Sequence, residues 1–201
     1  MAETKDLTIR RGETFSHVVR WGTVPIIYKA ITAISKAAPA VITCTGHGVP
    51  PGWPVAVSGV SGMTQINAAS APPRTRDYHA ATVVTADSVS LNDVDASMFS
   101  TYLSGGFLQY YTPADLTNYA ARMTLKDYVG GTVLDTLTSA NGKILISTSG
   151  KTVTILIDAV STAGYSWDSA VYDLELYDTS SPPNVVPLIG GNIIISPEVT
   201  T

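Results

Sequence analysis

The chain has 201 residues, of which 45% are hydrophobic and 14% are charged, and its formal net charge is −4. This length allows one large or two small domains whose cores need no covalent staples. The acidic balance excludes the basic stripe of a nucleic-acid-binding protein, and the single cysteine, Cys44, excludes an intramolecular disulfide and a cysteine zinc site.

The sequence shows no signal for a membrane or for secretion. Its apolar runs fall short of the ~18 residues that span a bilayer, and residues 1–10 lack the apolar stretch of a signal peptide. We therefore expect synthesis in the cytoplasm and no membrane insertion.

Apolar and polar residues alternate along most of the chain. Residues 7–10, 15–21, 151–157 and 171–177 follow a period of two, which is typical of half-buried strands. Residues 193–195 are a continuous isoleucine run, which suits a strand covered on both faces. The pattern predicts an all-β protein.

Turn signals separate the predicted strands. Asn141 and Gly142 form the dipeptide that favours a two-residue hairpin turn, with Leu137 and residues 144–146 as its arms. We expect a short helical turn within residues 115–123. Residues 1–10 and 197–201 are expected to be arms that only partner proteins order.

The middle of the chain differs in composition from its flanks. Residues 30–106 are rich in Ala, Ser, Gly and Pro and carry few charges before residue 74. The flanks, 1–29 and 107–201, contain the cleaner alternating strands. This contrast predicts that one small β domain is inserted into a loop of another.

The flanks resemble a family of phage proteins. Residues 12–15 read GETF, 114–123 read ADLTNYAARM, 171–176 read VYDLEL and 191–200 read GNIIISPEVT. In this order they resemble the β-sandwich domain at the N-terminus of phage baseplate upper proteins. The resemblance implies an antiparallel β-sandwich formed by 1–29 plus 107–201.

The inserted segment has a resemblance of its own. It contains GHG at 46–48, GWPVAVSGV at 52–60, GMTQIN at 62–67 and VSLNDVD at 89–95. These motifs resemble the small β-barrel module of phage structural proteins that is named for the FCCH half-domain of ubiquitin-activating enzymes. The resemblance implies a barrel over residues 30–106 that acts as a spacer or decoration, without ubiquitin chemistry.

Both resemblances imply a non-enzymatic structural protein of the virion tail. A baseplate part, a minor tail protein and a fibre-anchoring adaptor are all open, and so is its place along the particle. The expected partners are other virion tail proteins and further copies of the chain in a symmetric ring. We expect no cofactor and no metal.

An aromatic cluster near the proposed junction is the first candidate functional feature. Its members are Tyr102, Phe107, Tyr110 and Tyr111. Aromatic side chains are enriched at interfaces, and they also bury well where two modules meet. We expect these residues to line either a domain seam or a partner surface.

The alternative function is a receptor-binding or glycan-binding module on the phage surface. Sugar sites need an exposed aromatic ring beside polar groups, and Trp53, between two prolines, is the candidate contact. This hypothesis requires the indole of Trp53 to be exposed and predicts binding to a host-surface glycan.

Catalytic and metal-binding patterns are weak. Cys44 and His47 lack a third orienting group nearby, and the acidic residues at 92–95 lack the spacing of a calcium loop. Asp173 and Glu175 alternate on one strand, as a solvated face does. We therefore predict no catalytic residues.

Overall fold

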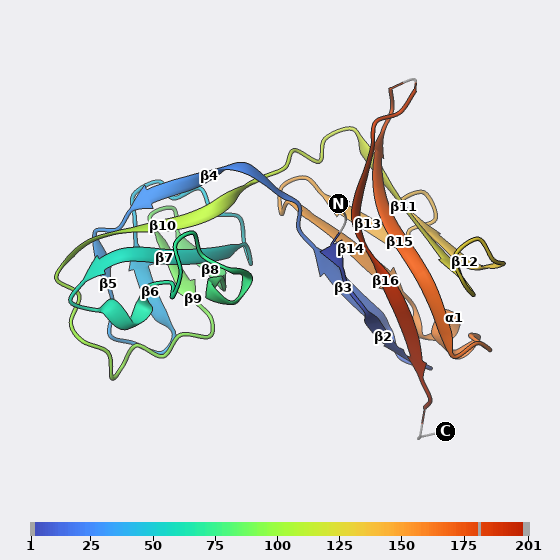
Figure 1. Ribbon diagram of the computed structural model, residues 1–201, viewed down its shortest axis with the longest axis horizontal. Helices are drawn as coiled ribbons and strands as arrows, with labels where there is room; N and C mark the ends of the chain where they lie inside the picture. The colour runs from blue at the N-terminus through green and yellow to red at the C-terminus, as the bar shows by residue number, and fades with distance from the viewer. Residues whose placement is uncertain (1–2, 181, 199–201) are drawn as a thin grey trace. The chain divides into compact units, whose positions relative to one another are not determined.

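The computed structural model describes residues 3–180 and 182–198. Their regular secondary structure is almost entirely β-strand, arranged in three sheets, which confirms the all-β prediction (Figure 1). The chain divides into two compact units. One comprises the described residues up to Trp21 and from Asp115 onward, and the other runs from Gly22 to Ala114.

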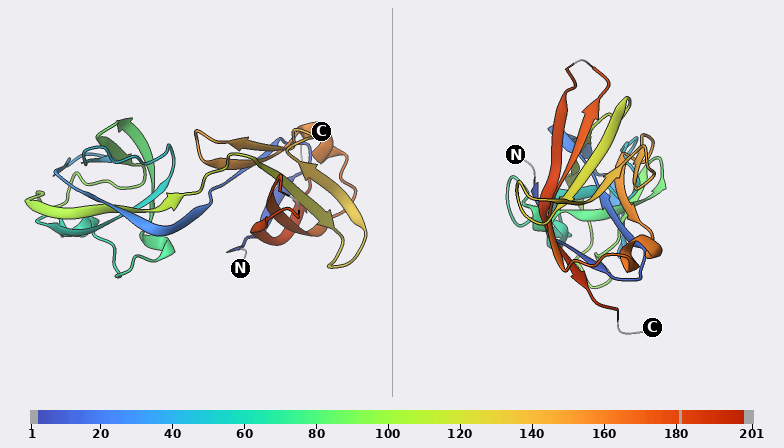
Figure 2. Two further views of the ribbon diagram at one scale, coloured as in Figure 1. Left: turned by 90° about the horizontal axis from the view of Figure 1, so that it is seen from above. Right: turned by 90° about the vertical axis from the view of Figure 1, so that its right-hand side faces the viewer.

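The first unit is a sandwich of two sheets, seen from two further directions in Figure 2. The larger sheet has the order β1-β16-β15-β11-β12, and β2 also pairs with β16. The smaller has the order β13-β14-β3. Their bounds are β1 Glu3–Thr4, β2 Leu7–Arg10, β3 Phe15–Val19, β11 Tyr119–Lys126, β12 Val133–Thr138, β13 Ile144–Ser147, β14 Thr152–Ile157, β15 Ser169–Asp178 and β16 Val185–Ser196.

Alternation places one side of each strand in the sandwich core. On β11, Met123 and Leu125 are buried, whereas Arg122 between the core positions lies on the outer face. Buried side chains from both sheets, such as Leu174 on β15 and Ile155 on β14, share a single cluster. The sandwich is therefore held by burial of apolar area between its sheets.

The N-terminal segment is part of this sandwich and not an arm. β1 and β2 run parallel to β16, while the other ladders of the unit are antiparallel. Leu7 and Ile9 are buried in the core. The arm prediction is wrong for residues 3–10, because the alternation of β2 fills a place in the sheet. Residues 1–2 and 199–201 of the predicted arms lie outside the described part of the chain.

The turn at Asn141 connects the two sheets instead of closing a hairpin. β12 pairs with β11 and β13 pairs with β14, in different sheets. Asn141 Oδ1 accepts hydrogen bonds from the backbone N–H of Thr138 (2.9 Å) and of Lys143 (3.1 Å). The side chain stabilises an arch between layers, so the hairpin prediction is wrong.

Local helix content is small. The expected turn at 115–123 is a turn only as far as Asn118, since β11 begins at Tyr119. One short helix, α1 (Ala159–Ala163), was not predicted, and Asp158 caps it by accepting from Ser161 N–H (2.8 Å). Among the described residues, no helix is long and apolar enough to cross a membrane.

The second unit is a seven-stranded antiparallel sheet in the order β4-β10-β7-β8-β9-β6-β5. Its core is centred on large buried side chains including Trp53, Leu108 and Tyr110. The strands are β4 Gly22–Ala30, β5 Ala33–Ile34, β6 Ala40–Thr43, β7 Pro54–Ser61, β8 His79–Thr85, β9 Ser88–Leu91 and β10 Ser104–Pro113, with short 3₁₀ helices at Thr64–Ile66 and Thr75–Asp77.

The sheet of the second unit curls but does not close. Its two end strands, β4 and β5, are joined by Ile31 and Thr32 alone, so the ends of the sheet must approach each other. No hydrogen-bonded ladder joins β4 to β5 among the described residues. The expected barrel is therefore an open, curled sheet.

The boundaries of the second unit lie outside the expected 30–106. Residues 22–29 and 107–114 belong to it and not to the sandwich. The reason is pairing: β4 and β10 form a long antiparallel ladder with each other, and β10 also pairs with β7. Composition changes near residue 30, whereas the ladder continues to Gly22.

Candidate interaction surfaces

Three exposed aromatic side chains gather on the outer face of the second unit. Tyr28 on β4 and Phe107 and Tyr111 on β10 are 55%, 48% and 41% exposed. The rings of Tyr28 and Phe107 meet edge to face with 6.3 Å between centroids. We call these three residues the aromatic face. Clustered exposed apolar area of this kind marks interaction sites.

The aromatic face contains only two of the four predicted cluster residues. Phe107 and Tyr111 share it because side chains two apart on a strand point the same way. Tyr110 points inward, is 1% exposed, and donates to the carbonyl oxygen of His47. Tyr102 is half-buried, with its hydroxyl 3.0 Å from the carbonyl oxygens of Ile31 and Gly105.

Two further aromatic residues were missed by the sequence reasoning. Tyr28 lies opposite Gln109 in the β4–β10 ladder, between Phe107 and Tyr111 along the neighbouring strand. The half-buried Tyr78 stacks on Tyr111 with centroids 5.9 Å apart. Tyr28 reaches this face only through the register between β4 and β10. That register cannot be predicted from the local sequence pattern.

Trp53 is a core residue and cannot be the proposed glycan contact. Its side chain is 2% exposed, and its Nε1 donates to the carbonyl oxygen of Tyr111 (3.1 Å). The prediction of an exposed Trp53 is wrong. Apolar burial and a partner for the indole N–H are together the usual environment of an interior tryptophan.

Cys44 and His47 flank a turn at residues 45–46, and their side chains make structural contacts. The imidazole Nδ1 accepts from the N–H of Val49 (2.9 Å), so Nε2 holds the ring hydrogen and donates to the carbonyl oxygen of Thr85 (2.9 Å). Cys44 is fully buried, and burial raises the pKa of its thiol to about 11. Both imidazole nitrogens are engaged, and the thiol stays protonated at neutral pH.

The acidic residues at 92–95 are engaged in local contacts. Asp95 Oδ1 accepts from Ser97 N–H (2.9 Å) and Oγ (2.6 Å), which is a turn of the kind aspartate favours. Asp93 lies 2.9 Å from the Nδ1 atom of His79. Within 3–180 and 182–198, no group of three or more His, Cys, Asp or Glu side chains could hold a metal ion.

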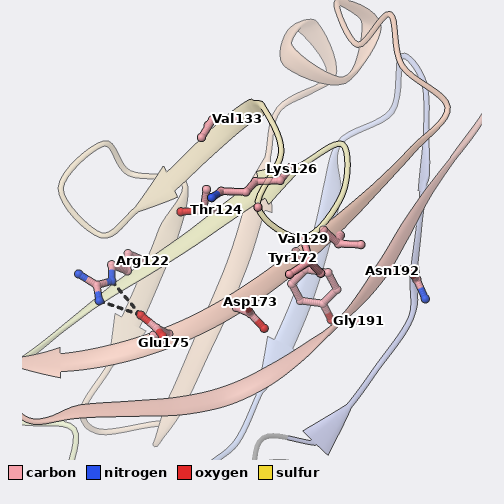
Figure 3. A pocket seen from close by; sticks show the side chains of 12 residues that line it. Arg122, Thr124, Lys126, Val129, Val133, Tyr172, Asp173, Glu175, Gly191 and Asn192 are labelled. Carbon is pink, nitrogen blue, oxygen red and sulfur yellow. Dashed lines mark hydrogen bonds and ion pairs between the residues drawn. The ribbon is translucent and has the colours of Figure 1, made fainter.

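A shallow groove of about 800 Å³, lined by both polar and apolar side chains, lies on the outer face of the first unit. Arg122 and Lys126 on β11 face it, with Asp173 and Glu175 on β15 (Figure 3). Arg122 Nε and Nη2 both lie 2.9 Å from Glu175 Oε2. Asp173 and Glu175 thus lie on one face of β15, and the guanidinium of Arg122 binds the carboxylate of Glu175.

Comparison with known proteins does not identify a family for this chain. No family model matches the sequence, and no curated protein matches it. The chain is similar to the crystal structure of human CDH23 EC21-23 at 12% identity, over 83% of this chain and 66% of that chain, with a TM-score of 0.18. At this TM-score, the similarity carries no argument about fold or function.

Proposed function

We propose that the chain is a non-enzymatic structural protein of a bacteriophage virion, located in the tail or baseplate region as a minor tail protein or fibre-anchoring adaptor. One observation supports this most strongly. The segments resembling the baseplate-type sandwich lie at 12–15, 114–123, 171–176 and 191–198. They fall almost wholly in the first unit, although nearly the entire second unit separates the first segment from the other three in sequence. The segments resembling the inserted phage module fall in the second unit.

The chemistry of the polar groups agrees with a role in assembly. A nucleophile needs a base within hydrogen-bonding reach and an orienting group. The imidazole of His47 is instead bonded to backbone on both sides, and the pKa of the Cys44 thiol is raised. Asp135, the most enclosed carboxylate of the sandwich, is bonded by Tyr165 and Lys143.

The aromatic face is the surface that we assign to contacts with other virion proteins. Tyr28, Phe107 and Tyr111 supply rigid apolar area of the kind that dominates interface energetics. The alternative, a glycan-binding module, depended on Trp53, which is buried. We therefore prefer the structural role.

The test is co-sedimentation of the purified protein with a tail extract. Wild type is expected to enter particle-sized fractions, and Phe107→Glu is expected to enter them at least tenfold less, because a carboxylate at an apolar contact loses its hydration. Val160→Glu is the matched control, since Val160 is 84% exposed on α1 in the other unit. A protein that ignores the extract but binds glycans would contradict the proposal and favour the alternative.

A further inference from the structure

One edge of β4 has no partner among the described residues, because β4 pairs with β10 only. Ile31 N–H donates to the carbonyl oxygen of Gly106 (3.0 Å). In an antiparallel ladder, bonded and non-bonded pairs alternate. The opposed pair Ala30 and Phe107 is therefore non-bonded, and the N–H and C=O groups of Ala30 point away from β10.

The same alternation fixes the extent of the free edge. Two and four residues before Ala30, the backbone groups of Tyr28 and Ile26 also point outward. On one side, the register shift of the β4–β10 ladder between Tyr111 and Thr112 breaks the alternation just before Ile26 and ends the row. On the other side, the backbone N–H of Ile31 bonds to β10 again. The free edge thus presents the backbone of Ile26, Tyr28 and Ala30, with Tyr28 at its midpoint.

We infer that a second copy of this chain pairs with β4 in antiparallel fashion, about a two-fold axis that passes beside Tyr28. In this register Tyr28 faces Tyr28 of the second copy, and Ile26 faces Ala30. All three outward residues then exchange both hydrogen bonds with the residue opposite. Any shifted register leaves at least one of them unpaired.

The side chains of β4 suit a second copy in this register. Lys29, the charged residue of the strand, lies opposite Ile27 and not opposite another lysine, so no like charges meet across the pair. The two tyrosines meet on one face of the joined sheet, as a cross-strand aromatic pair. Each is flanked by Phe107 of its own copy, so the two aromatic faces become continuous.

This pairing would be one contact of the proposed assembly, and its biological purpose rests on that proposed function. The pairing itself is tested on the isolated full-length protein. In Tyr28→Cys, the two introduced cysteines would have Cα atoms ~5.5 Å apart, within the range that a disulfide bridges. In Val24→Cys, on the same strand, they would be about 27 Å apart. Val24 is more exposed than Tyr28, at 78% against 55%, so random collisions between monomers would cross-link Val24→Cys, the control, faster than Tyr28→Cys. Native Cys44 is buried and does not compete in the reaction.

The first readout is covalent dimer under mild oxidation, and the second is the mass of wild type by light scattering. We expect wild type to be dimeric, and Tyr28→Cys to cross-link at least tenfold faster than Val24→Cys. Tyr28→Glu, which places two carboxylates opposite each other, is expected to raise the dimer dissociation constant at least tenfold.

Three results would overturn the inference: a monomeric wild type, equal cross-linking of the two cysteine variants, or a Tyr28→Cys that cross-links only to a protein of the tail extract. The last would assign the edge to another chain. Each leaves the proposed function standing if the protein still enters particles, so failure of the pairing is distinguishable from failure of the role.

Discussion

At the residue scale, a single enclosed carboxylate connects parts of the sandwich that are distant in sequence. Asp135 on β12 accepts from Tyr165 Oη (2.7 Å) and lies 2.9 Å from Lys143 Nζ. Burial would raise the pKa of Asp135, but these hydrogen bonds outweigh it and hold the pKa below its ordinary value. Burial, together with the hydrogen bond to Asp135, raises the pKa of Tyr165.

Replacing this carboxylate is expected to destabilise the protein. Asp135→Asn should lower the free energy of unfolding by about 1–3 kcal/mol, since it removes hydrogen bonds to a charged group. Because the folded pKa lies below the unfolded one, the stabilisation is complete above the unfolded value of ~4 and is lost as pH falls through the folded value. Urea unfolding at several pH values measures both effects.

The comparison variant is Asp168→Asn, whose side chain is 94% exposed. It is expected to change stability by less than about 1 kcal/mol, as surface ion pairs do. If the difference in unfolding free energy between wild type and Asp135→Asn were the same at pH 2 as at neutral pH, the stabilising role of the Asp135 carboxylate would be contradicted.

Cys44 offers a second test at this scale. Because the thiol is buried and its pKa is raised to about 11, it should react with a thiol reagent at neutral pH only when the protein unfolds. The reagent would be added with and without denaturant and the reaction followed by absorbance. Rapid labelling of native protein would contradict the buried position and reopen a role for the thiolate.

At the scale of elements, β2 is the strand whose position in the structure differs most from the sequence prediction. Ile9 is fully buried, while Thr8 beside it is exposed. Ile9→Ala is expected to lower the unfolding free energy by about 2–5 kcal/mol, the usual range for a buried aliphatic truncation. Thr8→Ala, on the opposite face, should change it little. Equal, small effects in denaturant unfolding would restore the prediction of a loose N-terminal arm.

The sequence predicts strands well and their partners poorly. Alternation at 7–10, 151–157 and 171–177 identified β2, β14 and β15, because it depends only on which side of a strand is buried. Asn141 and Gly142 gave a local hairpin signal that was wrong, since the strands beside them belong to different sheets. Pairing depends on contacts between residues far apart in sequence, which no local pattern records.

The candidate surface illustrates the same limit. Phe107 and Tyr111 belonged to the predicted cluster, which grouped residues by their nearness in sequence. Their spacing of four places both on one face of β10, whereas Tyr110 points to the other face. Tyr28 was missed, since it reaches them only through the ladder between β4 and β10. Trp53 was misplaced because flanking prolines suggest a surface loop, whereas the indole fills the core of the second unit.

At the scale of the whole molecule, the two units are expected to fold independently. The second unit has its own core, and its ends are adjacent, since Gly22 lies opposite Pro113 in the β4–β10 ladder. Residues 22–114 expressed alone should therefore unfold cooperatively, as followed by circular dichroism during heating. A segment without a cooperative transition would show that the second core depends on the first unit.

The central claim, that this chain is a structural part of a phage virion, is tested most directly by quantitative mass spectrometry of gradient-purified particles of the phage that encodes it. The account predicts that the chain is present at a fixed number of copies per particle, in constant ratio to other tail proteins across the particle peak. Absence of the chain from infectious particles, or an amount that varies from fraction to fraction, would contradict it.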